Sequence, residues 1–302
     1  MERNTKFLAA AAQMGPIQPG ETKESAVLRM IDLLKAAAVE NVSLVVYPEL
    51  CFTTFFPRYF LKNESGLAPY FENDLPTEII SELLNLAKAN EIFVCFGYAE
   101  KAGQNYFNTA AIFSDTGEFI GKYRKIHLPG HSEYEAWRAF QHLEKRYFKK
   151  GNLGFPVFSS KLGELGMCIC NDRRWPETFR MLALKGCEIA MLGYNTPRHY
   201  PLAPEHDHLQ DFHNHLCMQG ASYANGLWII ASAKAGIEDG CELIGGSCII
   251  SPTGEIKAQA ATLDDELVIS EIDLAECDRI RSNIFNFKLH RQPDDYKALA
   301  ES

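Results

Sequence analysis

Gly166-Met167-Cys168-Ile169-Cys170-Asn171-Asp172-Arg173-Arg174-Trp175-Pro176-Glu177 is the stretch of this chain that decides its fold. Residues 166–170 form a short apolar run, which is typical of a buried β-strand. The polar residues 171–174 interrupt it, and Pro176 followed by Glu177 is a common start for an α-helix. A strand that leads through a polar turn into a helix is the repeating unit of an α/β protein.

The same alternation extends in both directions along the chain. Strands are predicted at residues 7–13, 43–47, 92–98, 108–113, 118–122, 189–192, 227–233, 247–251 and 255–259. Amphipathic helices are predicted at residues 26–39, 76–89, 177–184 and 211–224, the second with Thr77 as its N-cap. The phrase Ser-Asp-Thr-Gly-Glu at 114–118 returns as Ser-Pro-Thr-Gly-Glu at 251–255, which hints at two related halves.

The chain shows no sign of division into domains. No linker rich in Ser, Gly or Pro separates its halves, so we expect one domain over residues 1–302, with layered sheets and helices outside. Residues 126–156 lack clear periodicity, and loops that long inside a compact domain are usually functional.

Composition narrows the class of protein. With 46% hydrophobic and 23% charged residues, the chain is ordinary for a globular protein. A net charge of −9 gives no electrostatic footprint for nucleic acid, and no apolar run approaches membrane-spanning length. Nine cysteines, an odd number mostly in apolar runs, indicate reduced thiols. We therefore expect a cytoplasmic protein without nucleic-acid or membrane partners.

Cys170 is the candidate nucleophile among these nine thiols. Strand alternation places Cys168 and Cys170 on the same face, with Cys170 as the last residue of the strand. A thiol at a strand-to-helix turn lies near free backbone N–H groups and the positive end of a helix, which favour the thiolate. Most of the cysteines are expected only to pack, but the charged residues that follow Cys170 favour a reactive role.

Two further motifs place charged residues after strands. Glu49, in Tyr-Pro-Glu-Leu at 47–50, follows an apolar strand, and strand ends are where open α/β sheets carry their sites. Lys125 belongs to a run of three cations with Lys122 and Arg124. Each motif alone fits a solvated surface equally well, and the basic run becomes functional only if one lysine turns inward beside an acid.

Taken together and in this order, Pro48-Glu49, Lys125 with His127, and Cys170-Asn171-Asp172 resemble the Glu-Lys-Cys triad of the nitrilase superfamily of carbon–nitrogen hydrolases. The similarity covers nearly the whole chain and is greatest to the N-carbamoyl-D-amino acid amidohydrolases. It is carried by residues 122–148, 170–177, 193–197 and 285–288. The resemblance implies an α/β fold built as a four-layer αββα sandwich. It also implies a homo-oligomer (dimer or tetramer), with residues 280–302 in its subunit contacts.

The resemblance further implies hydrolysis of an N-carbamoyl-D-amino acid, a small-molecule substrate, to the D-amino acid, carbon dioxide and ammonia, with no cofactor. Glu49 would act as the base, Cys170 as the nucleophile, and Lys125 with the backbone N–H of Asn171 as donors to the oxyanion. Glu144 resembles an additional acid of such sites. His127 and His142 are expected to line the same pocket in supporting roles.

Arg173 and Arg174 are the candidate substrate-binding pair. One of them, by preference Arg174, would hold the substrate carboxylate through its planar guanidinium. Asn195 and Thr196 follow another predicted strand and could add donors. In the alternative, both arginines are solvated, or one pairs structurally with Asp172 or Glu177.

Other activities stay open at this point. Within the superfamily they are a nitrilase, an aliphatic amidase or a β-ureidopropionase. From other classes, they are a catalytically silent binding subunit and a zinc-dependent amidohydrolase that would use the histidines at 206, 208, 213 and 215. No metal site is predicted, because this spacing does not place two histidines one turn apart on a helix.

Overall fold

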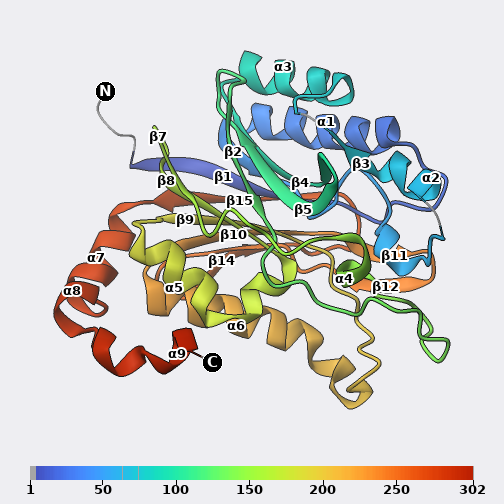
Figure 1. Ribbon diagram of the computed structural model, residues 1–302. Coiled ribbons are helices and arrows are strands. Elements are labelled where there is room, and N and C mark those ends of the chain that lie inside the picture. The colour runs from blue at the N-terminus through green and yellow to red at the C-terminus, as the bar shows by residue number, and fades with distance from the viewer. Residues whose placement is uncertain (1–4, 63, 74, 302) are drawn as a thin grey trace.

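Two β-sheets lie face to face in the centre of the molecule (Figure 1). The computed structural model describes residues 5–62, 64–73 and 75–301. The first sheet contains β1 (Lys6–Gln13), β2 (Val42–Val46), β3 (Phe71–Glu72), β4 (Phe93–Ala102), β5 (Asn105–Phe113), β6 (Phe119–Arg124) and β15 (Glu266–Asp273). The second contains β7 (Val157–Ser160), β8 (Gly163–Ile169), β9 (Ile189–Tyr194), β10 (Trp228–Ala233), β13 (Cys248–Ile250) and β14 (Ile256–Gln259). A separate hairpin is formed by β11 (Ala235–Glu238) and β12 (Cys241–Ile244).

Helices cover the outer face of each sheet, which gives the predicted four-layer αββα sandwich. On the first sheet these are α1 (Lys23–Val39) and α3 (Ser81–Ala89), and on the second α5 (Pro176–Leu184) and α6 (Gln210–Asn225). The shorter helices are α2 (Glu64–Leu67), α4 (Glu144–Tyr147), α7 (Ala275–Asn283), α8 (Phe287–His290) and α9 (Ala298–Glu301). The predicted cap of α3 is wrong: a 3-10 turn, Glu78–Ile80, precedes this helix, and the Thr77 side chain makes no capping hydrogen bond.

Strand β1 shows why the sheets stack in this way. Its side chains alternate between two cores: Ala9 and Ala11 face the second sheet, whereas Ala10 and Ala12 pack with residues of α1. All four are fully buried. A strand segment that is buried on both faces is mostly apolar at successive positions, which explains the continuous apolar run in the sequence.

The echo between the two halves has a structural counterpart. The order β1-β2-β4-β5-β6 in one sheet matches β8-β9-β10-β13-β14 in the other, with three parallel strands followed by two antiparallel ones. The repeated phrase forms the last turn in each sheet. Ser114 N donates to Glu118 O at 2.8 Å, and Ser251 N donates to Glu255 O at 2.9 Å. The interpretation of two related halves is therefore supported by topology as well as by the turn.

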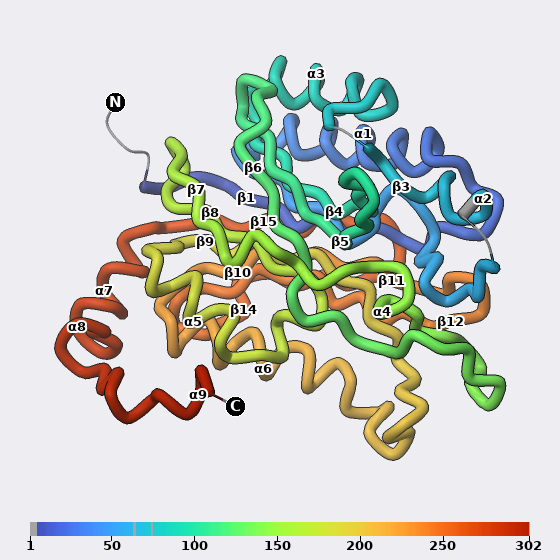
Figure 2. Tube along the Cα trace, in the orientation of Figure 1, coloured from blue at the N-terminus to red at the C-terminus, as the bar shows by residue number. Residues whose placement is uncertain are grey.

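The C-terminal helices run along the side of the molecule that carries α5 and α6 (Figure 2). Arg180 of α5 lies 4.3 Å from the ring centroid of Phe287, and the rings of Tyr223 and Phe285 meet edge to face at 5.0 Å. A role of residues 280–302 in subunit contacts stays a prediction. None of the helices in the described ranges combines the length and hydropathy that a membrane crossing requires.

Candidate active site

Glu49 lies between the two sheets, against one strand of each. It follows β2 after Tyr47 and Pro48, and its side chain is fully buried. A Cβ atom at Gly97 of β4 would lie 2.6 Å from Glu49 Cα, and one at Gly193 of β9 would lie 2.6 Å from Glu49 N. Both separations are shorter than real Cβ contacts allow. The backbone of Glu49 is thus enclosed by glycines from both sheets, which fixes the direction of its carboxylate.

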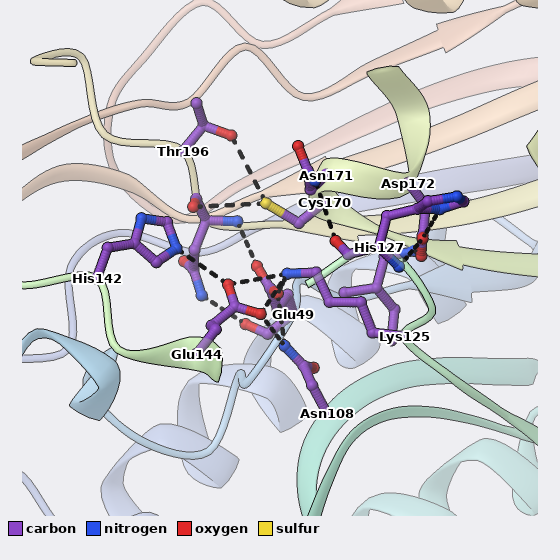
Figure 3. Close-up of polar contacts among 12 residues, drawn as sticks. Glu49, Asn108, Lys125, His127, His142, Glu144, Cys170, Asn171, Asp172 and Thr196 are labelled. Carbon is purple, nitrogen blue, oxygen red and sulfur yellow. Dashed lines mark hydrogen bonds and ion pairs between the residues drawn. The ribbon is translucent and has the colours of Figure 1, made fainter. Parts of the chain in front are cut away.

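Lys125 is the one cation of its run that turns inward. Lys122 and Arg124 both donate to Glu100. Lys125, which directly follows β6, is instead buried and only 1% exposed. Lys125 Nζ lies 2.6 Å from Glu49 Oε1 and 2.7 Å from Glu144 Oε2 (Figure 3). The structure therefore brings together the two predicted acids and the predicted lysine, as the functional interpretation of the basic run required.

Cys170 stands just outside β8. The prediction that it ends this strand is wrong by one residue: β8 ends at Ile169, and Cys170 opens a 3-10 turn, Cys170–Arg174, with φ at +48°. A non-glycine residue in this region costs about 1–2 kcal/mol of backbone strain. The thiol lies 3.7 Å from Asn195 O and 3.9 Å from Thr196 Oγ1, and Figure 3 shows Glu49 and Lys125 on the side of the sulfur opposite Thr196.

The charges of this cluster set its protonation states. Burial, together with repulsion by Glu144, raises the pKa of Glu49. Burial acts to lower the pKa of Lys125, but Glu144 and Glu49 outweigh it and raise that pKa. Burial would raise the pKa of Glu144, yet Lys125 and His142 hold it below its ordinary value. The ammonium therefore stays charged and can donate, while Glu49 is the acid best placed to exchange a proton.

The surroundings of Cys170 favour the protonated thiol at rest. Burial and the carboxylate of Glu49 raise the pKa of Cys170, although Lys125 and Arg173 act in the opposite direction. The turn and the helix end act in favour of the thiolate, but burial and the carboxylate that the other sheet brings close act against it. A resting thiol needs a base when it attacks, and the raised pKa of Glu49 suits that task.

Asn108 is a member of this cluster that the sequence did not indicate. Its Nδ2 donates to Glu49 Oε1 at 2.7 Å, and its carbonyl accepts from Lys125 N at 2.8 Å. Asn195 secures the same acid from the second sheet: its backbone N donates to Glu49 Oε2 at 3.0 Å and its Nδ2 to Glu49 O at 2.9 Å. The amide N–H groups of Asn195 thus serve Glu49, which differs from the predicted use as donors to a substrate.

Asp172 connects the turn at Cys170 to the segment of Lys125. Its buried carboxylate accepts from Ile169 N at 2.9 Å, Tyr123 Oη at 2.8 Å and His127 N at 3.0 Å, and it lies 2.7 Å from His127 Nδ1. Two of these residues flank Lys125, and one precedes Cys170. The Asp172 carboxylate therefore fixes the segment of Lys125 relative to the turn that carries Cys170.

His127 and His142 have different surroundings. The ring of His127 stacks on Trp175 at 5.1 Å and pairs with Asp172, and it is not part of the cavity wall, so the prediction that both histidines line the pocket is wrong for His127. His142 does line the cavity, and its Nε2 lies 3.1 Å from Glu144 Oε1. Asn171 also lines the cavity, and its Nδ2 donates to His127 O at 3.0 Å.

Replacing Asp172 by asparagine is expected to lower kcat by about 10²-fold and to destabilise the protein by about 2–4 kcal/mol, because a neutral amide cannot accept all four donors. Tyr123→Phe, which removes one donor, should have a smaller effect on both. Steady-state kinetics and urea unfolding measure these effects. A fall in stability with unchanged kcat would show that Asp172 supports only the fold.

Cys170 opens into a cavity of about 430 Å³. Its walls come from the loops after the strands and from the long segment between β6 and β7, as predicted for residues 126–156. Within the described ranges, the Arg, Lys, Asp and Glu residues that line it are all cationic: Arg58, Arg138, Lys145, Arg173 and Arg174. The protein as a whole carries a net charge of −9, so this cavity is a local cationic region in an acidic molecule.

The adjacent residues Arg173 and Arg174 have different roles. Arg173 is 2% exposed and donates to Asn214 Oδ1, Cys170 O and Thr196 Oγ1 at 2.7–2.8 Å, so it braces the nucleophile turn. Arg174 is exposed, lines the cavity and makes no hydrogen bond or ion pair with the described residues. Neither arginine pairs with Asp172 or Glu177, so Arg174 remains available to a ligand.

The histidines at 206, 208, 213 and 215 do not converge. The rings of His206 and His213 meet edge to face at 6.1 Å, while His215 Nε2 lies 3.1 Å from Gly246 O. Over residues 5–62, 64–73 and 75–301, no three His, Cys, Asp or Glu side chains are grouped in a way that could hold a metal ion.

Known proteins share this architecture. The sequence model of one family, described as carbon-nitrogen hydrolase, matches residues 8–282. An N-carbamoylputrescine amidase of Solanum tuberosum is 29% identical over 99% of this chain and 96% of its own length. A nitrilase of Pyrococcus abyssi is 31% identical over 86% of this chain and 88% of its own length. A crystal structure of a carbon-nitrogen hydrolase from Helicobacter pylori superposes with a TM-score of 0.83, 26% identity and coverage of 99% of both chains.

Proposed function

This chain belongs to the carbon-nitrogen hydrolase family, and from that premise we propose that it hydrolyses N-carbamoyl-D-amino acids to D-amino acids, carbon dioxide and ammonia. The observation that carries the proposal is the cavity at Cys170, whose charged lining residues are all cationic and include the unpaired Arg174. A carbamoyl amino acid offers what such a cavity can use: a ureido carbon for the thiol and a carboxylate for the arginine.

The chemical steps follow from the positions of Glu49, Lys125 and Cys170. Glu49 takes the thiol proton, and the sulfur attacks the ureido carbon. Lys125 and the backbone N–H of Asn171 stabilise the resulting oxyanion. Glu49 then returns the proton to the terminal nitrogen, so ammonia leaves and a thiocarbamate remains on Cys170. Water, deprotonated by Glu49, breaks the sulfur–carbon bond and releases an N-carboxy amino acid, which loses carbon dioxide.

The sign of the charge that the substrate carries beside its ureido group separates this proposal from a different ureide substrate. The relative from Solanum tuberosum is named for N-carbamoylputrescine, a cation at neutral pH. A cationic substrate needs a carboxylate or carbonyl cage, and among the described residues that line this cavity there is no Asp or Glu. An anionic substrate fits the cavity better.

The decisive experiment measures ammonia release from paired D- and L-N-carbamoyl amino acids, with N-carbamoylputrescine and a simple aliphatic amide alongside. We expect turnover of the carbamoyl amino acids with preference for the D enantiomers. Turnover restricted to the cation or to the amide would contradict the proposal. Preference for the L enantiomers would overturn the stereochemical part and leave the substrate class intact.

Arg174→Lys is expected to raise KM for N-carbamoyl amino acids by about tenfold, because an ammonium cannot reproduce a bidentate contact with a carboxylate. Turnover of a neutral ureide without a carboxylate should change little. Comparing kcat and KM on both substrates measures this split. A uniform loss on both would mean that Arg174 supports the fold or the nucleophile instead.

A further inference from the structure

The cations around the cavity are not equivalent once their partners are counted. Arg58 shares the buried Glu238 with the buried Lys234, and Arg138 pairs with Glu135 at 2.5 Å, so both of these cavity cations already have a carboxylate partner. Neither is needed to balance an anion in the cavity. The remaining cations are Arg173, Arg174 and Lys145.

These three cations have no carboxylate partner in the described part of the chain. Arg173 is buried among neutral acceptors. Arg174 makes no hydrogen bond or ion pair there, and neither does the exposed Lys145, the residue directly after Glu144 on α4. The neighbouring catalytic group of two carboxylates and one ammonium has a net charge of −1, so this group and the three cations together carry two positive charges.

An excess of two positive charges in a recessed site is complementary to a dianion. A substrate with one carboxylate would engage Arg174 and leave Lys145 without a partner. Arg173 cannot move to the substrate without releasing the turn that carries Cys170, since it donates to Cys170 O and Thr196 Oγ1. Lys145 is therefore the cation left to bind a second anionic group of the substrate.

We propose that the preferred substrates are N-carbamoyl amino acids with a carboxylate in their side chain, and that Lys145 is the residue that selects them. This inference rests on the proposed function, because it assigns the α-carboxylate to Arg174. The exposed position of Lys145 leaves its ammonium accessible from the cavity. A solvated ion pair contributes little by itself, but a cationic cavity focuses the field on an anion and increases its effect.

The test compares N-carbamoylaspartate with N-carbamoylleucine, which has a neutral side chain of similar branching, in the enantiomer that the enzyme turns over. At low ionic strength, we expect kcat/KM of the wild type to be higher for the aspartate derivative. Lys145→Gln should lower kcat/KM for that substrate by about fivefold to tenfold, the value of one partly desolvated charge contact, and leave the leucine derivative unchanged. Added salt should reduce the wild-type preference.

Lys149→Gln is the matched control, because it removes the same charge from a nearby exposed lysine that does not line the cavity. It should alter neither substrate. Equal losses on both substrates in the Lys145 variant, no loss on either, or a wild-type preference for the leucine derivative would each overturn this inference. Turnover of the leucine derivative without preference for aspartate leaves the proposed function standing. Absence of turnover on both derivatives overturns both proposals.

Discussion

Replacing Cys170 by serine is expected to lower kcat by about 10⁴-fold or more while the protein stays folded, since a neutral hydroxyl is a far weaker nucleophile than a thiolate. The side chain is 5% exposed, and serine differs from it by one atom. Active-site titration with iodoacetamide should label the wild type and miss the variant. Ammonia release and circular dichroism, measured on the same preparation, separate loss of chemistry from loss of fold.

Cys168→Ser provides the matched control. This thiol lies two residues earlier, is fully buried and belongs to the core between the sheets. It should retain substantial turnover even if burial of a hydroxyl reduces stability. If the Cys170 variant were as active as the wild type, or if the Cys168 variant were the inactive one, Cys170 would not be the nucleophile.

Glu49→Gln is expected to lower kcat by about 10³-fold, because the amide keeps the shape of the side chain but cannot accept the thiol proton. Burial and Glu144 raise the pKa of Glu49. The wild-type kcat should therefore fall as the pH is lowered through that raised pKa, where the base becomes protonated. The variant should lack this acidic limb in a pH profile of kcat.

Glu100→Gln is the control for the loss of a buried, ion-paired carboxylate. Glu100 is 1% exposed and pairs with Lys122 and Arg124 at 2.5 and 2.7 Å, outside the cavity lining. This variant should lose stability in urea unfolding and keep its turnover. Wild-type rates for Glu49→Gln across the pH range would require another base.

Lys125 is less suitable for such a test, although it is equally central to the proposed chemistry. Its ammonium is the shared partner of Glu49 and Glu144, both of which are fully buried. Removing the cation leaves two buried carboxylates unpaired, and breaking a buried ion pair costs about 3–5 kcal/mol. Loss of activity in a Lys125 variant would therefore combine chemistry with unfolding.

Local patterns determined much of the fold before any contact was known. Residues 166–177 predict a strand, a turn and a helix, and β8, the turn at Cys170 and α5 follow in that order. This succeeds because side chains buried on a strand or helix repeat with the period of that element. Strand β15 escaped prediction because its apolar residues Leu267, Val268, Ile269 and Ile272 pack on both faces and follow no strict alternation.

The sequence by itself also determined which residue types could form the candidate site, since the motifs at Glu49, Lys125 and Cys170 each lie within a few consecutive residues. Only the tertiary structure decided their environment. Asn108 and Asn195 contact Glu49 across 59 and 146 positions of the chain. The pKa of the Cys170 thiol likewise depends on burial and on a carboxylate from the other sheet. The pKa of a group depends on all the charges that folding brings close to it, and a short stretch of sequence does not contain those charges.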